Sequence, residues 1–188
     1  MKDARVLKCE PGARLFYSML LVGLCGCGTS VHDDVARGDM DALTRKIERE
    51  PELLESRNAL GKTPLHYAAT FAQKEAMEFL IEQGADVSAP DGTGLTPLHV
   101  AAIVDVRGAA RLLLDAGAAL ETKDSFGDTP LHAAAMHGRM RVLEFLLDRG
   151  GDASARNQEG LTPLDLARRH DQTEALERLL REDAPADG

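Results

Sequence analysis

The fold of this chain is decided by the stretch Thr63-Pro64-Leu65-His66, because the same four residue types begin again at Thr96 and at Thr129. A fourth copy begins at Thr162 and differs only in its last residue, which is Asp165. Successive copies are 33 residues apart. Glycines keep the same step at two other places in the unit, namely Gly61, Gly94, Gly127 and Gly160, and then Gly84, Gly117 and Gly150. A fixed period of this length indicates a stack of repeated units.

The residue types in each copy predict where its helices begin and end. Thr63 can cap a helix through its hydroxyl group, and Pro64 suits the first helical position because an N–H there would be unpaired anyway. Leu65 and the pair Ala68-Ala69 follow at helical spacing, and the alanines allow neighbouring helices to approach closely. A second, leucine-rich helix ends at Gly84, where we expect a positive φ. Second helices are predicted over residues 74–83, 107–116, 141–149 and 173–181, with leucines such as Leu113, Leu179 and Leu180 in the core.

This pattern resembles the ankyrin repeat family, whose units open on Gly-x-Thr-Pro-Leu-His-x-Ala-Ala and close on a Gly-Ala-Asp turn, as residues 61–69 and 84–86 do here. The resemblance covers roughly residues 33–183 and implies an all-α repeat solenoid with hairpin-like fingers between the units. We expect a short linker over residues 28–32, an N-terminal cap unit over 33–57, full repeats over 58–90, 91–123 and 124–156, a C-terminal cap unit over 157–183, and a flexible tail over 184–188.

The first 27 residues differ in kind from the rest of the chain. Four basic residues within the first 14 precede an apolar stretch over residues 15–24, which is too short to cross a membrane. This order is typical of a signal peptide. The stretch Leu24-Cys25-Gly26-Cys27 resembles a bacterial lipobox, so we expect Cys27 to be lipidated and the mature protein to be anchored in the cell envelope, facing the periplasm and at the outer membrane if the cell has one. The alternative is cleavage without lipidation, which would release a soluble periplasmic protein.

Charge and composition narrow the classes of function. Removal of residues 1–27 would leave 18 basic and 29 acidic side chains, a net charge of −11, compared with −9 for the whole chain. An acidic domain disfavours binding to nucleic acid, which depends on clustered Lys and Arg. All three cysteines lie in the leader, and the repeats contain no nucleophile with a recognisable base motif around it. We therefore expect a monomer with no enzymatic activity and no cofactor.

The histidines also favour a structural interpretation. His66, His99 and His132 share one repeat position, and the resemblance implies that each bonds backbone atoms at the turn between units. His137 and His170 are one repeat apart, which is too far for them to share a zinc ion. We expect His32, in the linker, to be exposed to solvent. The sequence therefore predicts no metal site.

The resemblance also implies where a partner would bind. Family members use the concave face, which is formed by the fingers and by the residues that follow each Ala-Ala pair. The apolar residues there, and one histidine, are the candidates for partner binding, because exposed apolar surface commonly marks an interface: Leu60, Phe71, Leu95, Ile103, Val104, Phe126, Met136 and His137. The preferred function is a non-catalytic protein-interaction module of the bacterial envelope, and the alternative is a regulator or effector in the cytoplasm of its own cell or of a host.

Overall fold

The computed structural model describes residues 30–182, so the predicted leader, Cys27 and the tail over 184–188 lie outside the described residues. Within that range the chain forms ten α-helices and one short 3-10 helix, η1. Their bounds are α1 Val31–Arg37, α2 Met40–Arg49, η1 Pro51–Glu55, α3 Pro64–Thr70, α4 Lys74–Glu82, α5 Pro97–Ile103, α6 Arg107–Asp115, α7 Pro130–Met136, α8 Met140–Asp148, α9 Pro163–Arg169 and α10 Thr173–Glu182. The second helices agree with the predicted ranges to within one residue at each end.

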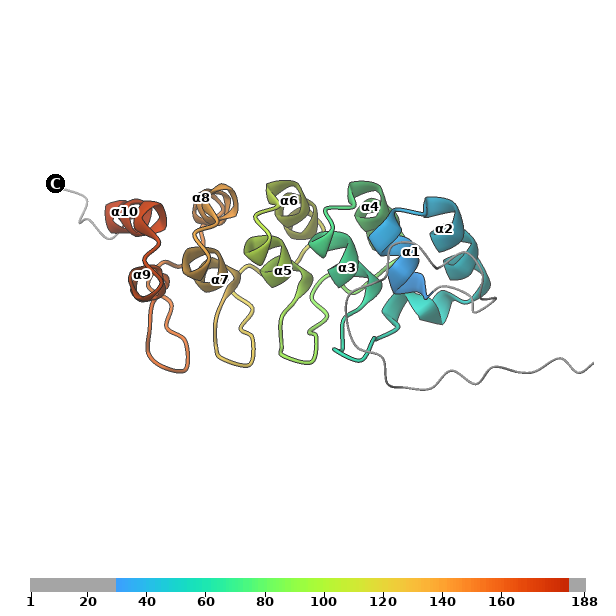
Figure 1. Cartoon of the computed structure of the whole chain (residues 1–188), viewed down its shortest axis with the longest axis horizontal. Coiled ribbons are helices and arrows are strands. Elements are labelled where there is room, and N and C mark those ends of the chain that lie inside the picture. The colour runs from blue at the N-terminus through green and yellow to red at the C-terminus, as the bar shows by residue number, and fades with distance from the viewer. Residues whose placement is uncertain (1–29, 183–188) are drawn as a thin grey trace, which may run out of the picture.

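The helices are arranged in two parallel rows along one axis (Figure 1). The odd-numbered helices α1 to α9 form the inner row, the even-numbered helices α2 to α10 form the outer row, and loops extend from the inner row on the side away from the outer row. Each inner helix packs against the next inner helix along the axis, as α7 does against α5 and α9. The all-α repeat stack expected from the sequence is therefore confirmed.

The core is a strip between the two rows. Leu65 and the following alanines Ala68 and Ala69 are fully buried in α3, and the equivalent residues of α5 and α7 are buried too. From the outer row, Leu80, Leu113, Leu143, Leu146 and Leu179 complete the strip. Leu180 is a correction to the sequence analysis. It was expected in the core, but its side chain is 47% exposed, because it occupies the repeat position of Leu114 and Leu147, which are also only half-buried.

The N-terminal unit begins earlier than the sequence analysis proposed. Helix α1 starts at Val31, inside the segment expected to be a linker, and Ser30 caps it in a reciprocal capping box with Asp33. His32 was expected to be exposed, and this was wrong: only 7% of it is exposed, and its Nε2 lies 2.9 Å from the carbonyl oxygen of Lys62. In α1, Asp34 is fully buried and forms ion pairs with Arg37 and Lys46. Hence the first unit is tied to the stack by a histidine, as the full repeats are.

The C-terminal unit is adapted to end the stack. Its Asp165 replaces the histidine of the other units, and its carboxylate accepts hydrogen bonds from the backbone N–H and the hydroxyl of Thr162, at 3.0 and 2.9 Å. Arg168 stands where the full repeats have the second, buried alanine, and its side chain is exposed. A further repeat would have to bury this guanidinium group, so the polar substitution closes the stack.

Candidate functional site

The concave face is built from four fingers and the C-terminal ends of the inner helices. The fingers are residues 58–62, 91–95, 124–128 and 157–161. In each one the first residue is Asn or Asp, whose Oδ1 accepts the N–H groups of the residues two and four positions later. For Asp91 these distances are 2.8 Å to the nitrogen of Thr93 and 3.1 Å to that of Leu95. The backbone N–H of Asp91 also donates to the carbonyl of Leu95 at 2.8 Å. Each finger is therefore a closed turn that holds its own shape.

The fingers also bond to one another. The N–H of Gly92 donates to the carbonyl of Leu60 at 2.9 Å, and the same contact recurs from Ser125 to Thr93 at 3.1 Å and from Gln158 to Phe126 at 3.0 Å. Such contact requires glycine in the preceding finger: a Cβ on Gly94, whose φ is +82°, would lie 2.7 Å from the nitrogen of Ser125. The four fingers consequently form one continuous surface.

Buried histidines connect each inner helix to the finger of the following unit. In α3, Nδ1 of His66 accepts the N–H of Thr63 at 3.2 Å, and Nε2 lies 2.9 Å from the carbonyl of Leu95. Because an N–H only donates and a carbonyl only accepts, the ring must be neutral with its proton on Nε2. His99 has the same arrangement with Thr96 and Asp128. The expected structural role of the repeat histidines is thus confirmed, and His132 repeats the geometry with Leu161.

These environments shift the pKa of several groups. Burial lowers the pKa of His66 and His99 more than the backbone hydrogen bonds and nearby carboxylates raise it. Burial acts to raise the pKa of Asp91, but the hydrogen bonds from Thr93 and Leu95 together outweigh it, so this pKa lies below its ordinary value. His66 and His99 therefore favour their neutral forms, and both of their ring nitrogens are already hydrogen-bonded. Neither is free to act as a general base.

The candidate partner-binding residues fall into two groups. Leu60, Phe71 and Phe126 are 64%, 51% and 66% exposed. The other five are only half-buried, and they are Leu95, Ile103, Val104, Met136 and His137. Ile103 packs against the core, while burial and then the charge of Arg139 lower the pKa of His137. The exposed apolar surface is therefore concentrated at three of the eight positions.

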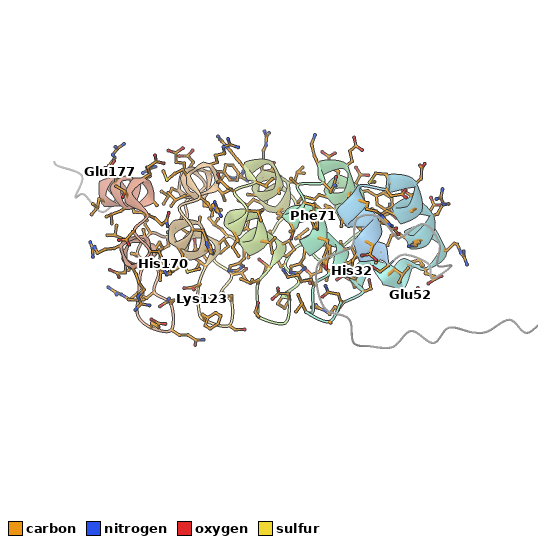
Figure 2. All side chains as sticks on the ribbon, in the orientation of Figure 1. His32, Glu52, Phe71, Lys123, His170 and Glu177 are labelled. Carbon is orange, nitrogen blue, oxygen red and sulfur yellow. The ribbon has the colours of Figure 1, made fainter. Side chains whose placement is uncertain are left out.

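An aromatic cluster beside Phe71 was missed in the sequence analysis. The Phe71 ring centroid lies 6.0 Å from that of Tyr67, which lies 5.2 Å from that of His32 in an edge-on arrangement. The Tyr67 hydroxyl accepts a hydrogen bond from Nδ2 of Asn58 at 3.0 Å. Phe71 lies at the C-terminal end of α3 and His32 lies in α1 (Figure 2). The large side chain of Tyr67 could have indicated this cluster in the sequence, because the other full repeats have Val and Ala at this position.

The described residues offer little for other kinds of site. Over residues 30–182 no group of three or more His, Cys, Asp or Glu side chains is placed to hold a metal ion. In the same range no helix is long and apolar enough to cross a membrane. The fold and this surface define a class of protein, a stacked helical repeat that presents a preformed face to another molecule.

Comparison with known proteins gives the family. The family model for ankyrin repeats (3 copies) matches residues 31–124 and 107–187, which is more than half of the chain. The chain therefore belongs to the ankyrin repeat family, whose members generally act as protein-interaction modules. It is similar to the human DNA-binding protein RFXANK, with 35% identity over 57 residues. That match covers 30% of this chain and 22% of the human protein, so the two share a segment of repeats.

Proposed function

We propose that this protein is a non-catalytic interaction module that binds a protein partner through its concave face. One observation carries the proposal: Leu60 and Phe126 occupy the same position of the first and third fingers, and both are exposed. The other two fingers have Thr93 and Glu159 at this position, so the fold accepts polar residues there. Since folding does not require these large apolar groups, partner binding accounts for them better than structure does.

Phe71 supports the same conclusion from the inner row. It caps the C-terminal end of α3, and the equivalent residues in the following units are Val104, His137 and His170. His170 lies beside α9 and is exposed like Phe71 (Figure 2). A rigid aromatic group over a buried scaffold loses little side-chain entropy on binding, and Phe is enriched at interface centres.

We favour a protein over a nucleic acid as the partner. The name of the human relative refers to DNA, but that protein is matched over only a fifth of its length. Binding to phosphate backbones requires an excess of clustered cations, and this chain has 22 Lys and Arg against 31 Asp and Glu.

The proposed location is the bacterial envelope, with Cys27 lipidated as the membrane anchor. Support comes from the sequence of residues 1–27, in which a basic start, an apolar stretch and the lipobox-like Leu24-Cys25-Gly26-Cys27 follow in that order. The acidic repeats offer no electrostatic attraction to anionic lipid, so a membrane-bound form would depend on the lipid.

The proposal is tested with the double variant Phe71→Ser and Phe126→Ser. Partners are first captured by cross-linking in the envelope fraction and identified by mass spectrometry, and the affinity of the purified pair is then measured by titration calorimetry. Because both side chains are exposed, the variant should keep the helical circular dichroism and the melting temperature of the wild type while binding weakens by about 2 kcal/mol or more.

Thr93→Ser is the matched control, since it alters the same finger position without removing an apolar group. Undiminished affinity in the folded double variant would rule out the concave face as the binding surface.

A further inference from the structure

The outer helix α6 differs from its neighbours in charge. At the fifth position of the outer helices, α4, α8 and α10 have Glu78, Glu144 and Glu177, whereas α6 has Arg111. At the first position α6 adds Arg107, whose side chain forms no ion pair among the described residues. Helix α6 lies at the middle of the outer row, between α4 and α8 (Figure 1). An acidic protein therefore carries a local group of cations at the centre of the face opposite its fingers.

A glycine inside the same helix has no structural explanation. Gly108 is the second residue of α6, where α4, α8 and α10 have Glu75, Arg141 and Glu174. A Cβ at Gly108 would meet nothing within 4 Å, and its φ lies outside the left-handed region. Neither close packing nor backbone conformation requires glycine here, although glycine is a weaker helix former than the residues at this position in the other outer helices. A residue that weakens its helix and is not required by packing is expected where function requires it.

Gly108 lies where two surface hollows meet. One hollow, of about 500 Å³, lies between α4 and α6 and is lined by Ala72, Val106 and Leu112 together with the ion pair of Lys74 and Glu78. The other, of about 520 Å³, lies between α6 and α8 and is lined by Arg107, Arg111, Phe145 and Arg149. Gly108, Arg111 and Asp115 line both. The two hollows thus form a trough across α6, with apolar groups beside a neutral ion pair at one end and arginines at the other.

The cationic end is held in place by the surrounding side chains. The guanidinium groups of Arg107 and Arg149 lie over the Phe145 ring, at 5.4 and 5.3 Å from its centroid. Asp115 pairs with Arg149 at 2.9 Å and with Arg111 at 3.5 Å. Asp115 therefore pairs with two of the three arginines that line this end, and a net positive charge remains.

We propose that this trough across α6 is a second docking surface, and that it binds an acidic segment of a partner protein that also carries apolar side chains. Carboxylates of the segment pair with Arg107, Arg111 and Arg149, and its apolar side chains contact Ala72, Val106 and Leu112. Charge complementarity selects this occupant, because arginine forks pair with carboxylates in bidentate geometry. The surface lies on the outer row and is separate from the concave face, so both can be occupied together.

The experiment uses the purified full-length chain and a fluorescein-labelled peptide of repeated Glu-Glu-Leu units, with fluorescence anisotropy as the readout. We expect saturable binding that weakens as salt rises, weaker binding of a Glu-Glu-Ser peptide, and no binding of a Lys-Lys-Leu peptide. The double variant Arg107→Glu and Arg111→Glu should lower the affinity for the Glu-Glu-Leu peptide at least about tenfold. Gly108→Gln should abolish binding by filling the trough while leaving the fold intact.

Two controls separate this site from general charge and from the concave face. Arg45→Glu, an exposed charge reversal on α2, should bind the peptide almost as the wild type does, and so should the double variant Phe71→Ser and Phe126→Ser. The proposal is overturned if the Glu-Glu-Leu peptide does not bind, if Arg45→Glu weakens binding as much as the α6 reversal, or if Gly108→Gln retains full affinity. Tighter binding of an oligothymidylate than of the peptide at the same arginines would also overturn it, since the occupant would then be a nucleic acid.

Discussion

At the residue scale, the repeat histidines make the stability of the stack depend on pH. His66 and His99 must stay neutral to accept at Nδ1 and donate from Nε2. Burial lowers their folded-state pKa below the ordinary 6.5. Their contribution is therefore complete above about pH 6.5 and is lost as the pH falls below it, because the unfolded chain then binds protons that the folded chain does not.

We expect the free energy of unfolding to fall by up to about 1.4 kcal/mol per pH unit for each of these two histidines as the pH drops from 6.5 toward their folded pKa values. Urea unfolding at pH 7.5, 6.5, 5.5 and 4.5 measures the slope. In the double variant His66→Asn and His99→Asn the curve should be flatter in this range. Asp91 and Asp165, whose pKa values are lowered, lose their contribution only below about pH 3.8, so they do not obscure the effect. A wild-type curve as flat as that of the variant would contradict the assigned tautomers.

A second residue-scale prediction compares two glycines with the same backbone conformation. Gly94 and Gly160 have φ of +82° and +77°, but a Cβ would lie 2.7 Å from the next finger's backbone at Gly94 and would meet nothing at Gly160. Gly160→Ala should cost about 1–2 kcal/mol, the strain of a left-handed residue. Gly94→Ala should cost roughly 1 kcal/mol more, because it also displaces the hydrogen bond between fingers. Thermal melts of both variants measure the difference, and equal losses would show that the fingers do not depend on this close approach.

At the element scale, the contribution of a leucine in an outer helix depends on how deeply its position is buried in the stack. Leu113 in α6 is fully buried, and α6 packs against α4, α5 and α8. Leu180 in α10 is 47% exposed, and α10 packs against α8 and α9. Leu113→Ala should therefore destabilise the protein by about 2–5 kcal/mol, whereas Leu180→Ala should cost less than about 1 kcal/mol. Chemical denaturation of the two variants provides the comparison. Similar losses would argue against a continuous core.

The elements also show what could be predicted from the sequence. The inner and outer helices of the full repeats were predictable because Thr-Pro marks the start of each inner helix, glycine marks the end of each outer helix, and this pattern recurs four times at a fixed period. The start of α1 was not predictable from the sequence. There Ser30 caps the helix and His32 bonds the next unit, but neither lies in a Thr-Pro-Leu-His phrase. For the candidate site, exposure of Leu60 and Phe126 followed from their finger position, whereas half-burial of Ile103 and Val104 depends on packing between helices that periodicity does not describe.

At the scale of the whole molecule, the C-terminal end of the stack and its two faces differ in the groups that they expose. Asp165 and Arg168 close the C-terminal end of the stack against further units, so growth by head-to-tail stacking is disfavoured. The fingers present apolar groups on one face, and α6 presents arginines on the other. The residues that line the trough across α6 are not among the candidate residues of the concave face. The two proposed docking surfaces should therefore respond to mutation independently.

The last prediction concerns how the molecule is held in the cell. If Cys27 carries the lipid, the variant Cys27→Ser expressed in a bacterial host with two membranes should move from the membrane fraction to the soluble fraction, because the acidic repeats have no other attraction for the bilayer. Labelling with a radioactive or alkyne-bearing fatty acid checks the modification itself and should be lost in the same variant.

Cys25→Ser is the matched control, since it changes the neighbouring thiol of the same motif and should leave both fractionation and labelling unchanged. Retention of Cys27→Ser at the membrane, with release of Cys25→Ser, would assign the lipid to the other cysteine. A soluble, unlabelled wild-type protein in the periplasm would instead support cleavage of residues 1–27 without lipidation, and the repeat stack would then act as a freely diffusing binding protein.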